Sequence, residues 1–330
     1  MPFKKPPAIL SVALLFLSIG GHAFAQSNGL GVTPKQSYTM KAGEQATNSL
    51  FLSNLNKTQP LTVQITVVDF EAQDETGTAK LLKASDQQQT AWSLKPYITI
   101  ADVVNVPPGA NKQVPFTLKL PANVGAGTYY SAIEYTASTG SGQQQVNIAA
   151  STATLLFINV PGEARELLTL QSFGMTNGNS LTSKYSSVFH AQPEFFAYKM
   201  KNSGNVAESP AGSIIIKNIF GKTVATIDNA NPKAQIGLIG QTRKFTGCNP
   251  KDRASEKLPL DNNCTALKLS PGFYSATLAI LYGQNGQPTR QIGATAHFWY
   301  LPWSSVIILL IVLLALAWVI YRLYRRMSRR

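Results

Sequence analysis

The sequence predicts an all-β protein: two tandem immunoglobulin-like β-sandwiches followed by a single C-terminal transmembrane helix. Three observations support this fold class. Short alternating apolar runs are separated by turn residues, the same signals return in the second half, and one long apolar run lies near the C-terminus. The predicted segments of the 330 residues are a signal peptide (1–25), the two sandwiches (26–162 and 163–300), the helix (301–324) and a basic tail (325–330).

The first sandwich is predicted from seven strand-like segments rich in β-branched and aromatic residues. Turns rich in glycine, asparagine and proline separate them, as at Lys41–Glu44 and Pro107–Ala110. Seven short strands at this spacing are typical of an immunoglobulin-like sandwich. The expected strands are Gln36–Met40, Ala46–Asn54, Leu61–Phe70, Tyr97–Val106, Lys112–Leu120, Thr128–Ala137 and Gln145–Val160.

The second sandwich is predicted because the same order of signals follows Pro161-Gly162. Phe195–Asn202 and Gly212–Phe220 repeat the two early strands, and Pro271–Ala276 resembles Gly127–Ala132. We expect Tyr130 and Tyr274 to be corner tyrosines, whose hydroxyls bond to nearby backbone. Gln241–Leu267 fits the pattern least well, so we expect a tied-down loop there.

The two ends of the chain carry targeting signals. Lys4 and Lys5, the apolar run Ala8–Ile19 and Ala23-Phe24-Ala25 form a signal peptide that we expect to be cleaved after Ala25; the alternative is a retained signal anchor. Near the C-terminus, Trp303–Tyr321 would span about 28 Å as a helix, enough to cross the hydrocarbon core of a bilayer. Five arginines follow this run. Arginines next to a membrane span stay on the cytoplasmic side, so the sequence predicts a cytoplasmic C-terminus and an extracellular ectodomain, as in a type I single-pass membrane protein.

The net charge of +13 is unevenly distributed. The segment between the two targeting signals carries 22 basic and 16 acidic residues, and the excess lies after residue 164, where there are 14 basic and 7 acidic residues. Phospholipid headgroups and anionic wall polymers are the nearest partners for such a surface outside the membrane, and nucleic acid is not expected there. Ordinary solubility charge is the alternative interpretation.

The two cysteines, Cys248 and Cys264, lie in the part expected outside the cytoplasm. We expect a disulfide, and two free thiols are the alternative. Two cysteines without matching histidines do not make the usual closed zinc site, so no metal site is predicted.

No catalytic constellation is visible in the sequence, and we expect neither an enzyme nor a cofactor. After loss of His22, only His190 and His297 remain, far apart in the chain, and the common hydrolase, zinc-protease, P-loop and dinucleotide motifs are missing. One acidic cluster is present, formed by Asp69, Glu71, Asp74 and Glu75. We interpret it as a solvated hairpin, and weak calcium binding is the alternative. Trp92 is expected in a core, with carbohydrate stacking as the minor alternative.

The order of several short motifs resembles the WxL-interacting proteins of Gram-positive-type bacteria, which have two immunoglobulin-like domains and one membrane span. The motifs in the first half are Gly31–Pro34, Val67–Phe70, Trp92, Pro108-Gly109 and Gly127–Tyr129. Those in the second are Asn202–Val206, Pro210–Gly212, Phe220–Lys222, Arg243–Phe245, Gly272–Tyr274 and the closing Phe298-Trp299 and Pro302-Trp303. The cysteine pair departs from that family. The first half also looks like the N-terminal domain of pilus chaperones, which are soluble.

The resemblance implies a cell-surface binding protein. Its first domain would bind peptidoglycan or another cell-wall polymer, and its second would engage WxL-type or other surface or host proteins. No ligand-binding residue is carried over. The alternative function is a chaperone-like assembly factor that pairs an exposed edge strand with secreted surface subunits.

Overall fold

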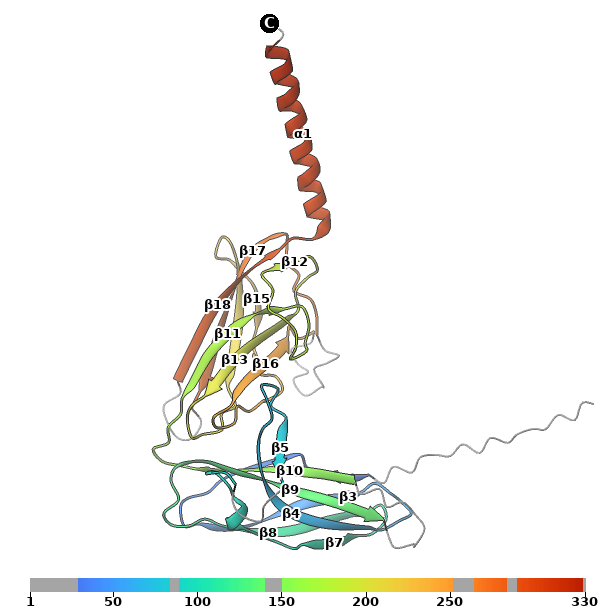
Figure 1. The fold of residues 1–330 in the computed structure, drawn as a ribbon, viewed down its shortest axis with the longest axis vertical. Helices are drawn as coiled ribbons and strands as arrows, with labels where there is room; N and C mark the ends of the chain where they lie inside the picture. Colours follow the sequence, from blue (N-terminus) through green and yellow to red (C-terminus); the bar gives the residue numbers. More distant parts are fainter. Residues whose placement is uncertain (1–28, 84–88, 140–149, 252–263, 284–289, 329–330) are drawn as a thin grey trace, which may run out of the picture.

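The computed structural model describes residues 29–83, 89–139, 150–251, 264–283 and 290–328. Most of these residues lie in β-strands, and one long helix follows the last strand. Figure 1 shows two groups of strands in line with the helix: the second group lies next to the helix, and the strands of the first group run across that direction at the far end. The expected signal peptide, residues 1–25, lies outside the described residues.

The first group, residues 30–160, forms two sheets, and we call it the first sandwich. One sheet has the strand order β1 (Leu30–Val32), β3 (Gln45–Asn54), β8 (Asn111–Lys119) and β6 (Ile98–Ile100). The other has the order β2 (Lys35–Thr39), β10 (Ala150–Val160), β9 (Gly127–Thr139), β4 (Leu61–Ala72) and β5 (Ala79–Leu82), with β7 (Val103–Val106) also paired to β4. A short 3₁₀ helix, η1 (Lys95–Tyr97), precedes β6.

The second group, residues 168–300, also forms two sheets, and we call it the second sandwich. One sheet has the order β11 (Leu168–Thr176), β13 (Phe195–Asn202) and β16 (Thr242–Cys248). The other has the order β12 (Val188–Phe189), β18 (Arg290–Tyr300), β17 (Gly272–Tyr282), β14 (Ala211–Asn218) and β15 (Thr223–Ile227).

The two sandwiches repeat one strand order. In each, the last strand pairs antiparallel with the strand before it and parallel with a short early strand, β2 on β10 and β12 on β18. This agrees with the repeat seen in the sequence. Division into two independent immunoglobulin-like domains stays a prediction.

Each sandwich encloses its own apolar core, because alternate residues of its strands face inward. In β4, for example, Leu61, Val63 and Ile65 are buried while the residues between them are exposed. The second core has the same origin, with Leu278 and Ile280 of β17 buried among β13 and β14 residues.

Several strand predictions were wrong in detail. The expected strand Tyr97–Val106 is split, because β6 pairs with β8 while β7 pairs with β4 in the opposite sheet. The alternating pattern runs through both pieces, so the crossing could not be read from periodicity. The expected loop Gln241–Leu267 contains a regular strand, β16. Strands β1, β5, β11, β12, β15 and β18 were not predicted.

The corner tyrosine of the first sandwich was assigned to the wrong residue. Tyr274 does donate to the carbonyl of Ser270, at 2.6 Å, as expected. In the first sandwich, however, the equivalent bond runs from Tyr129 to Gly125, at 3.2 Å. Gly127 and Gly272 are the equivalent residues, each two positions before its tyrosine, so the two segments align one residue away from the alignment assumed. Tyr130 is instead buried in an apolar cluster between the two sandwiches.

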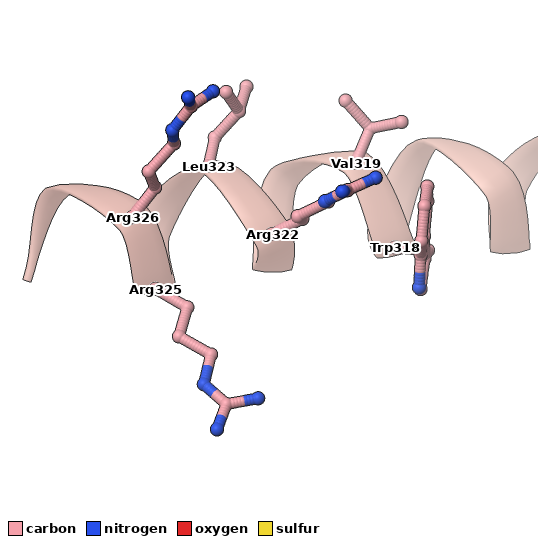
Figure 2. Close-up of a pocket in the computed structure, with 6 residues that line it drawn as sticks. All are labelled: Trp318, Val319, Arg322, Leu323, Arg325 and Arg326. Atoms are coloured by element: carbon pink, nitrogen blue, oxygen red, sulfur yellow. The ribbon is translucent and has the colours of Figure 1, made fainter. Parts of the chain in front are cut away.

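The apolar run forms helix α1 (Trp303–Met327), three residues longer at its end than expected. It is the one described helix long and apolar enough to span a membrane, and none of its residues is buried by the protein. Figure 2 shows its last turns, where Arg325 and Arg326 point to different sides and Arg322 lies near Trp318. The Arg322 guanidinium is 5.2 Å from the centre of that ring. The orientation of the helix in a membrane stays a prediction.

Cys248 and Cys264 are joined in a disulfide, in agreement with the sequence-based expectation. The bond fixes the end of β16 to the segment that returns beside it, where Thr265 donates its backbone N–H to Asn249. Residues 252–263 of the intervening loop lie outside the described part of the chain. That this disulfide forms in the cell stays a prediction.

Candidate functional site

The two sandwiches meet through a third apolar cluster, which we call the junction cluster. Its fully buried members are Val68, Phe70, Tyr130, Ala132, Phe157 and Leu238. All but Leu238 lie on the outer face of the β4–β9–β10 sheet, and Leu238 comes from the loop before β16. Burial of this outer face removes apolar surface from water, so the junction holds the sandwiches together in the same way that a core does.

The β4–β5 hairpin reaches from the first sandwich to the second (Figure 1). The Glu75 carbonyl accepts the backbone N–H of Lys244 on the edge of β16, at 2.9 Å, and the Glu75 carboxylate pairs with Lys199 on β13 at 2.8 Å. The side chain of Gln241 donates to the carbonyl of Asp74. The hairpin thus covers part of one sheet edge of the second sandwich.

Gly77 allows this contact. It has a positive φ of 78°, and a Cβ atom there would overlap the guanidinium group of Arg243. That guanidinium in turn donates to the carbonyl of Ile236. A side chain at position 77 would therefore strain the backbone and displace the Arg243 guanidinium group.

The acidic cluster belongs to this hairpin and does not form a common site. Asp69 is fully buried and accepts hydrogen bonds from the Ser93 hydroxyl, the Ser131 hydroxyl and the backbone of Gln89. Glu71 pairs with Lys80 on the neighbouring strand. No group of three or more possible metal ligands was found among the described residues, so nothing in them supports calcium binding.

Trp92 packs against the junction cluster, with its ring centre 5.7 Å from that of Tyr130. This agrees with the expected packing role.

Polar contacts also join the two sandwiches, near the segment of the chain that connects them. The Thr128 amide donates to the carbonyl of Asn205 at 2.9 Å, and the Asn205 side chain donates to Ala126 while accepting the amide of Arg165. Asn205 was quoted in the sequence only as part of a turn motif. A turn signal does not reveal which distant backbone the side chain reaches.

Glu208, three residues after Asn205, is a buried carboxyl group in the second sandwich. It has no exposed surface, its Oε2 accepts the Gly283 amide at 3.4 Å, and its Oε1 has no hydrogen-bond partner among the described residues. Burial raises the pKa of Glu208 to about 7, and the nearby Glu166 adds to the rise while Gly283 and Arg290 oppose it.

The two histidines lie near the membrane helix. His190 shares a hydrogen bond with the carbonyl of Leu301 at 2.7 Å and stacks on Trp303, so it links the second sandwich to the start of α1. His297 stacks on Phe273. These contacts are structural, and the absence of enzymatic activity stays a prediction.

The last strand of each sandwich has an edge that is only partly paired. On β10, the parallel partner β2 covers Leu155–Asn159 and leaves Ala150–Thr154 without a ladder partner on that side. On β18, the parallel partner β12 covers only Trp299 and Tyr300, and Arg290–Phe298 have no ladder on that side. In the described parts of the chain, no other strand pairs with either of these stretches. Sequence periodicity predicts strands but does not show which edges stay open.

No family model matches the sequence, and no curated protein matches it. Among solved structures, the chain is similar to the class 5 fimbriae chaperone CfaA (12% identity, TM-score 0.38, covering 83% of this chain and 100% of that one). It is also similar to a complex of the Salmonella enterica SafA pilin with the SafB chaperone (11%, 0.36, 81% and 96%) and to the E. coli chaperone DraB (11%, 0.34, 81% and 96%). Because these identities and TM-scores are low, neither family membership nor function follows from them.

Proposed function

We propose that the protein is a membrane-anchored assembly factor, without enzymatic activity, that holds extended segments of exported proteins by pairing them with an open strand edge. The observation that carries this proposal is the partly unpaired last strand of each sandwich. An exposed edge offers a row of backbone N–H and C=O groups, and an added strand satisfies them.

The direction of the open groups on β10 follows from its neighbour. Leu155 donates its N–H toward the β2 side, to Pro34, and N–H and C=O of one residue point the same way in an extended strand. Ser151 and Ala153 therefore point theirs to the open side. This edge adjoins the junction cluster, since Ala153 and Leu155 pack against it.

The position of the membrane helix supports the proposed role as an assembly factor. Helix α1 begins at Trp303, and only two residues separate it from the end of the last strand at Tyr300, so the second sandwich is held next to the membrane surface. Its excess of basic residues is favourable there, at about 1 kcal/mol for each lysine or arginine near an anionic surface. A chain emerging from the membrane would meet such a protein early.

The topology belongs to this proposal: cleavage after Ala25, the sandwiches outside and Arg330 inside. Protease added to cells without their wall should digest the sandwiches and leave a small C-terminal fragment. A sandwich region protected from the protease would overturn the orientation.

Peptidoglycan binding and membership of the WxL-interacting family remain predictions without a supporting observation in the described residues.

The test is a pull-down with the full chain in detergent, using co-secreted proteins in one arm and purified peptidoglycan in the other. A variant with Ser151→Pro and Thr295→Pro removes one outward N–H from each open edge, where proline is compatible with a strand. The matched control carries alanine at both positions and keeps these donors. We expect co-secreted proteins to be retained by the wild type and the control and lost by the proline variant. Sedimentation with peptidoglycan and no retained protein would overturn the proposal.

A further inference from the structure

A long open edge of the described residues belongs to β18. Its pairing to β17 is continuous from Arg290 to Tyr300, without a bulge. Trp299 and Leu301 donate their N–H groups to Ser187 and Phe189, away from β17. By the alternation of an extended strand, Gln291, Gly293, Thr295 and His297 point their backbone groups to that same side, and all four residues are exposed.

This edge has none of the usual protections against strand addition. Between Gln291 and Phe298 the sequence contains no lysine, no proline and no glutamate or aspartate. Some other described edges are short or partly covered: β1 and β6 have three residues each, and the β4–β5 hairpin lies against β16. β11, with nine residues, is also an edge strand, at the margin of the opposite sheet. The β18 edge is therefore long and unprotected enough to accept a strand.

A groove runs beside the edge. It has a volume of about 400 Å³ and lies between β11 and β18, lined by residues 168–173 of the one and 292–294 of the other. Leu170, Phe173 and Ile292 make its surface apolar, and each packs against the core of the second sandwich. Ala294 and Ala296 follow on the inner face of β18, so the groove side of this strand is lined by small residues.

We infer that this edge and groove bind one extended segment of an exported protein that carries apolar side chains at alternate positions. The segment pairs its backbone with Gln291, Gly293, Thr295 and His297. Its alternate side chains then enter the groove over Leu170, Phe173 and Ile292, because side chains of an added strand alternate between the two faces of the sheet. This inference rests on the proposed function and names its binding edge and the chemistry of its client.

A second copy of the chain that paired antiparallel through its own β18 does not fit this edge. Two β18 strands paired antiparallel would run in opposite directions, and each continues within three residues into its own membrane helix. One of the two helices would then point away from the membrane that the other enters. The occupant is accordingly another polypeptide.

The probe is a peptide of about ten residues that alternates valine and threonine, long enough to span the open part of β18. Its matched control has the same sequence with every second amide N-methylated on the edge that would pair. The protein is the full chain in detergent, and the readout is amide hydrogen exchange resolved to single residues.

Without peptide, we expect fast exchange at Gln291, Gly293, Thr295 and His297 and slow exchange at the residues between them, which donate to β17. The unmodified peptide should slow exchange at the four open amides at least tenfold, and the methylated peptide should not. Leu170→Glu should abolish the protection, whereas Leu281→Glu, on the exposed face of the neighbouring β17, should leave it intact.

Protection at Ser151 and Ala153 alone would overturn this inference and leave the proposed function standing. No protection on either strand, together with no retained protein in the pull-down, would overturn both. Slow exchange at the four amides without peptide, in a protein that sediments as a dimer, would show that a second copy occupies the edge and would also overturn the inference.

Discussion

The two sandwiches share a strand order but differ in how their last strands are covered. On β10, five residues pair with β2, whereas only two residues of β18 pair with β12. The short early strand is the reason, since β2 has five residues and β12 has two. A fold that is repeated in outline thus presents different edges, and the length of one neighbouring strand decides which backbone groups are available to a partner.

The largest expected effect tests whether the sandwiches behave as one unit. Phe70 is 1% exposed in the junction cluster, with its ring centre 4.9 Å from that of Tyr130. Phe70→Ala should lower the free energy of unfolding by about 3–5 kcal/mol, because it leaves a cavity between the sandwiches. Calorimetry should also show two separate transitions in place of one. Phe51→Ala, at a residue 54% exposed, is the control, and an equally small effect of Phe70→Ala would contradict the structural role of the junction.

The disulfide distinguishes the second sandwich from the first, which has no cysteine. Reduction should lower the free energy of unfolding of the second sandwich by about 3 kcal/mol, as the chain-entropy model gives for a loop closed across 16 positions. Chemical denaturation with and without reductant measures the loss. Thiol labelling of the denatured, unreduced protein is the companion measurement, and two labelled cysteines would show that the bond does not form.

Two of the buried carboxyl groups, one in each sandwich, sharpen the comparison in another way. Asp69 of the first sandwich has three hydrogen-bond donors, whereas burial raises the pKa of Glu208 in the second from its ordinary value of 4.5 to about 7. A raised carboxyl pKa means that the folded state binds more protons than the unfolded state between these values. Stability should therefore fall by about 3 kcal/mol as the pH rises through this window.

Glu208→Gln should remove that dependence, because an amide does not ionise. Denaturation at about pH 4.5 and about pH 8 compares the variant with the wild type on both sides of the window given by the shifted pKa. We expect the variant to be the more stable protein at the higher pH and similar at the lower. Identical pH profiles would mean that Glu208 does not titrate in this window.

The smallest expected effects concern the two corner tyrosines. Tyr274→Phe removes a half-buried hydrogen bond to Ser270 and should cost about 1 kcal/mol. Tyr129→Phe removes a longer, exposed bond to Gly125 and should cost less than this. Thermal unfolding of both variants measures the difference. A larger loss from Tyr129→Phe would mean that the two corners are not equivalent in the way their geometry indicates.

The sequence by itself determined the features that depend on local pattern. Alternation predicted the strands that correspond to β3, β4, β8 and β9, since the side chains of a strand alternate between its two faces. The length of the apolar run predicted the membrane helix. The spacing of Cys248 and Cys264 was enough to propose their pairing, but the strand in which Cys248 lies was predicted as a loop.

Only the tertiary structure decided which distant segments meet. The acidic residues of the β4–β5 hairpin were expected to be solvated, yet Glu75 pairs with Lys199 because the second sandwich packs onto that hairpin. Asp69 is buried within the first sandwich, where Ser93 and Ser131 donate to it. Trp92, Tyr130 and Leu238 come together from three parts of the chain to form the junction. The open edge of β18 likewise results from how far β12 extends beside it. Such contacts depend on long-range packing, which the period of a single segment does not encode.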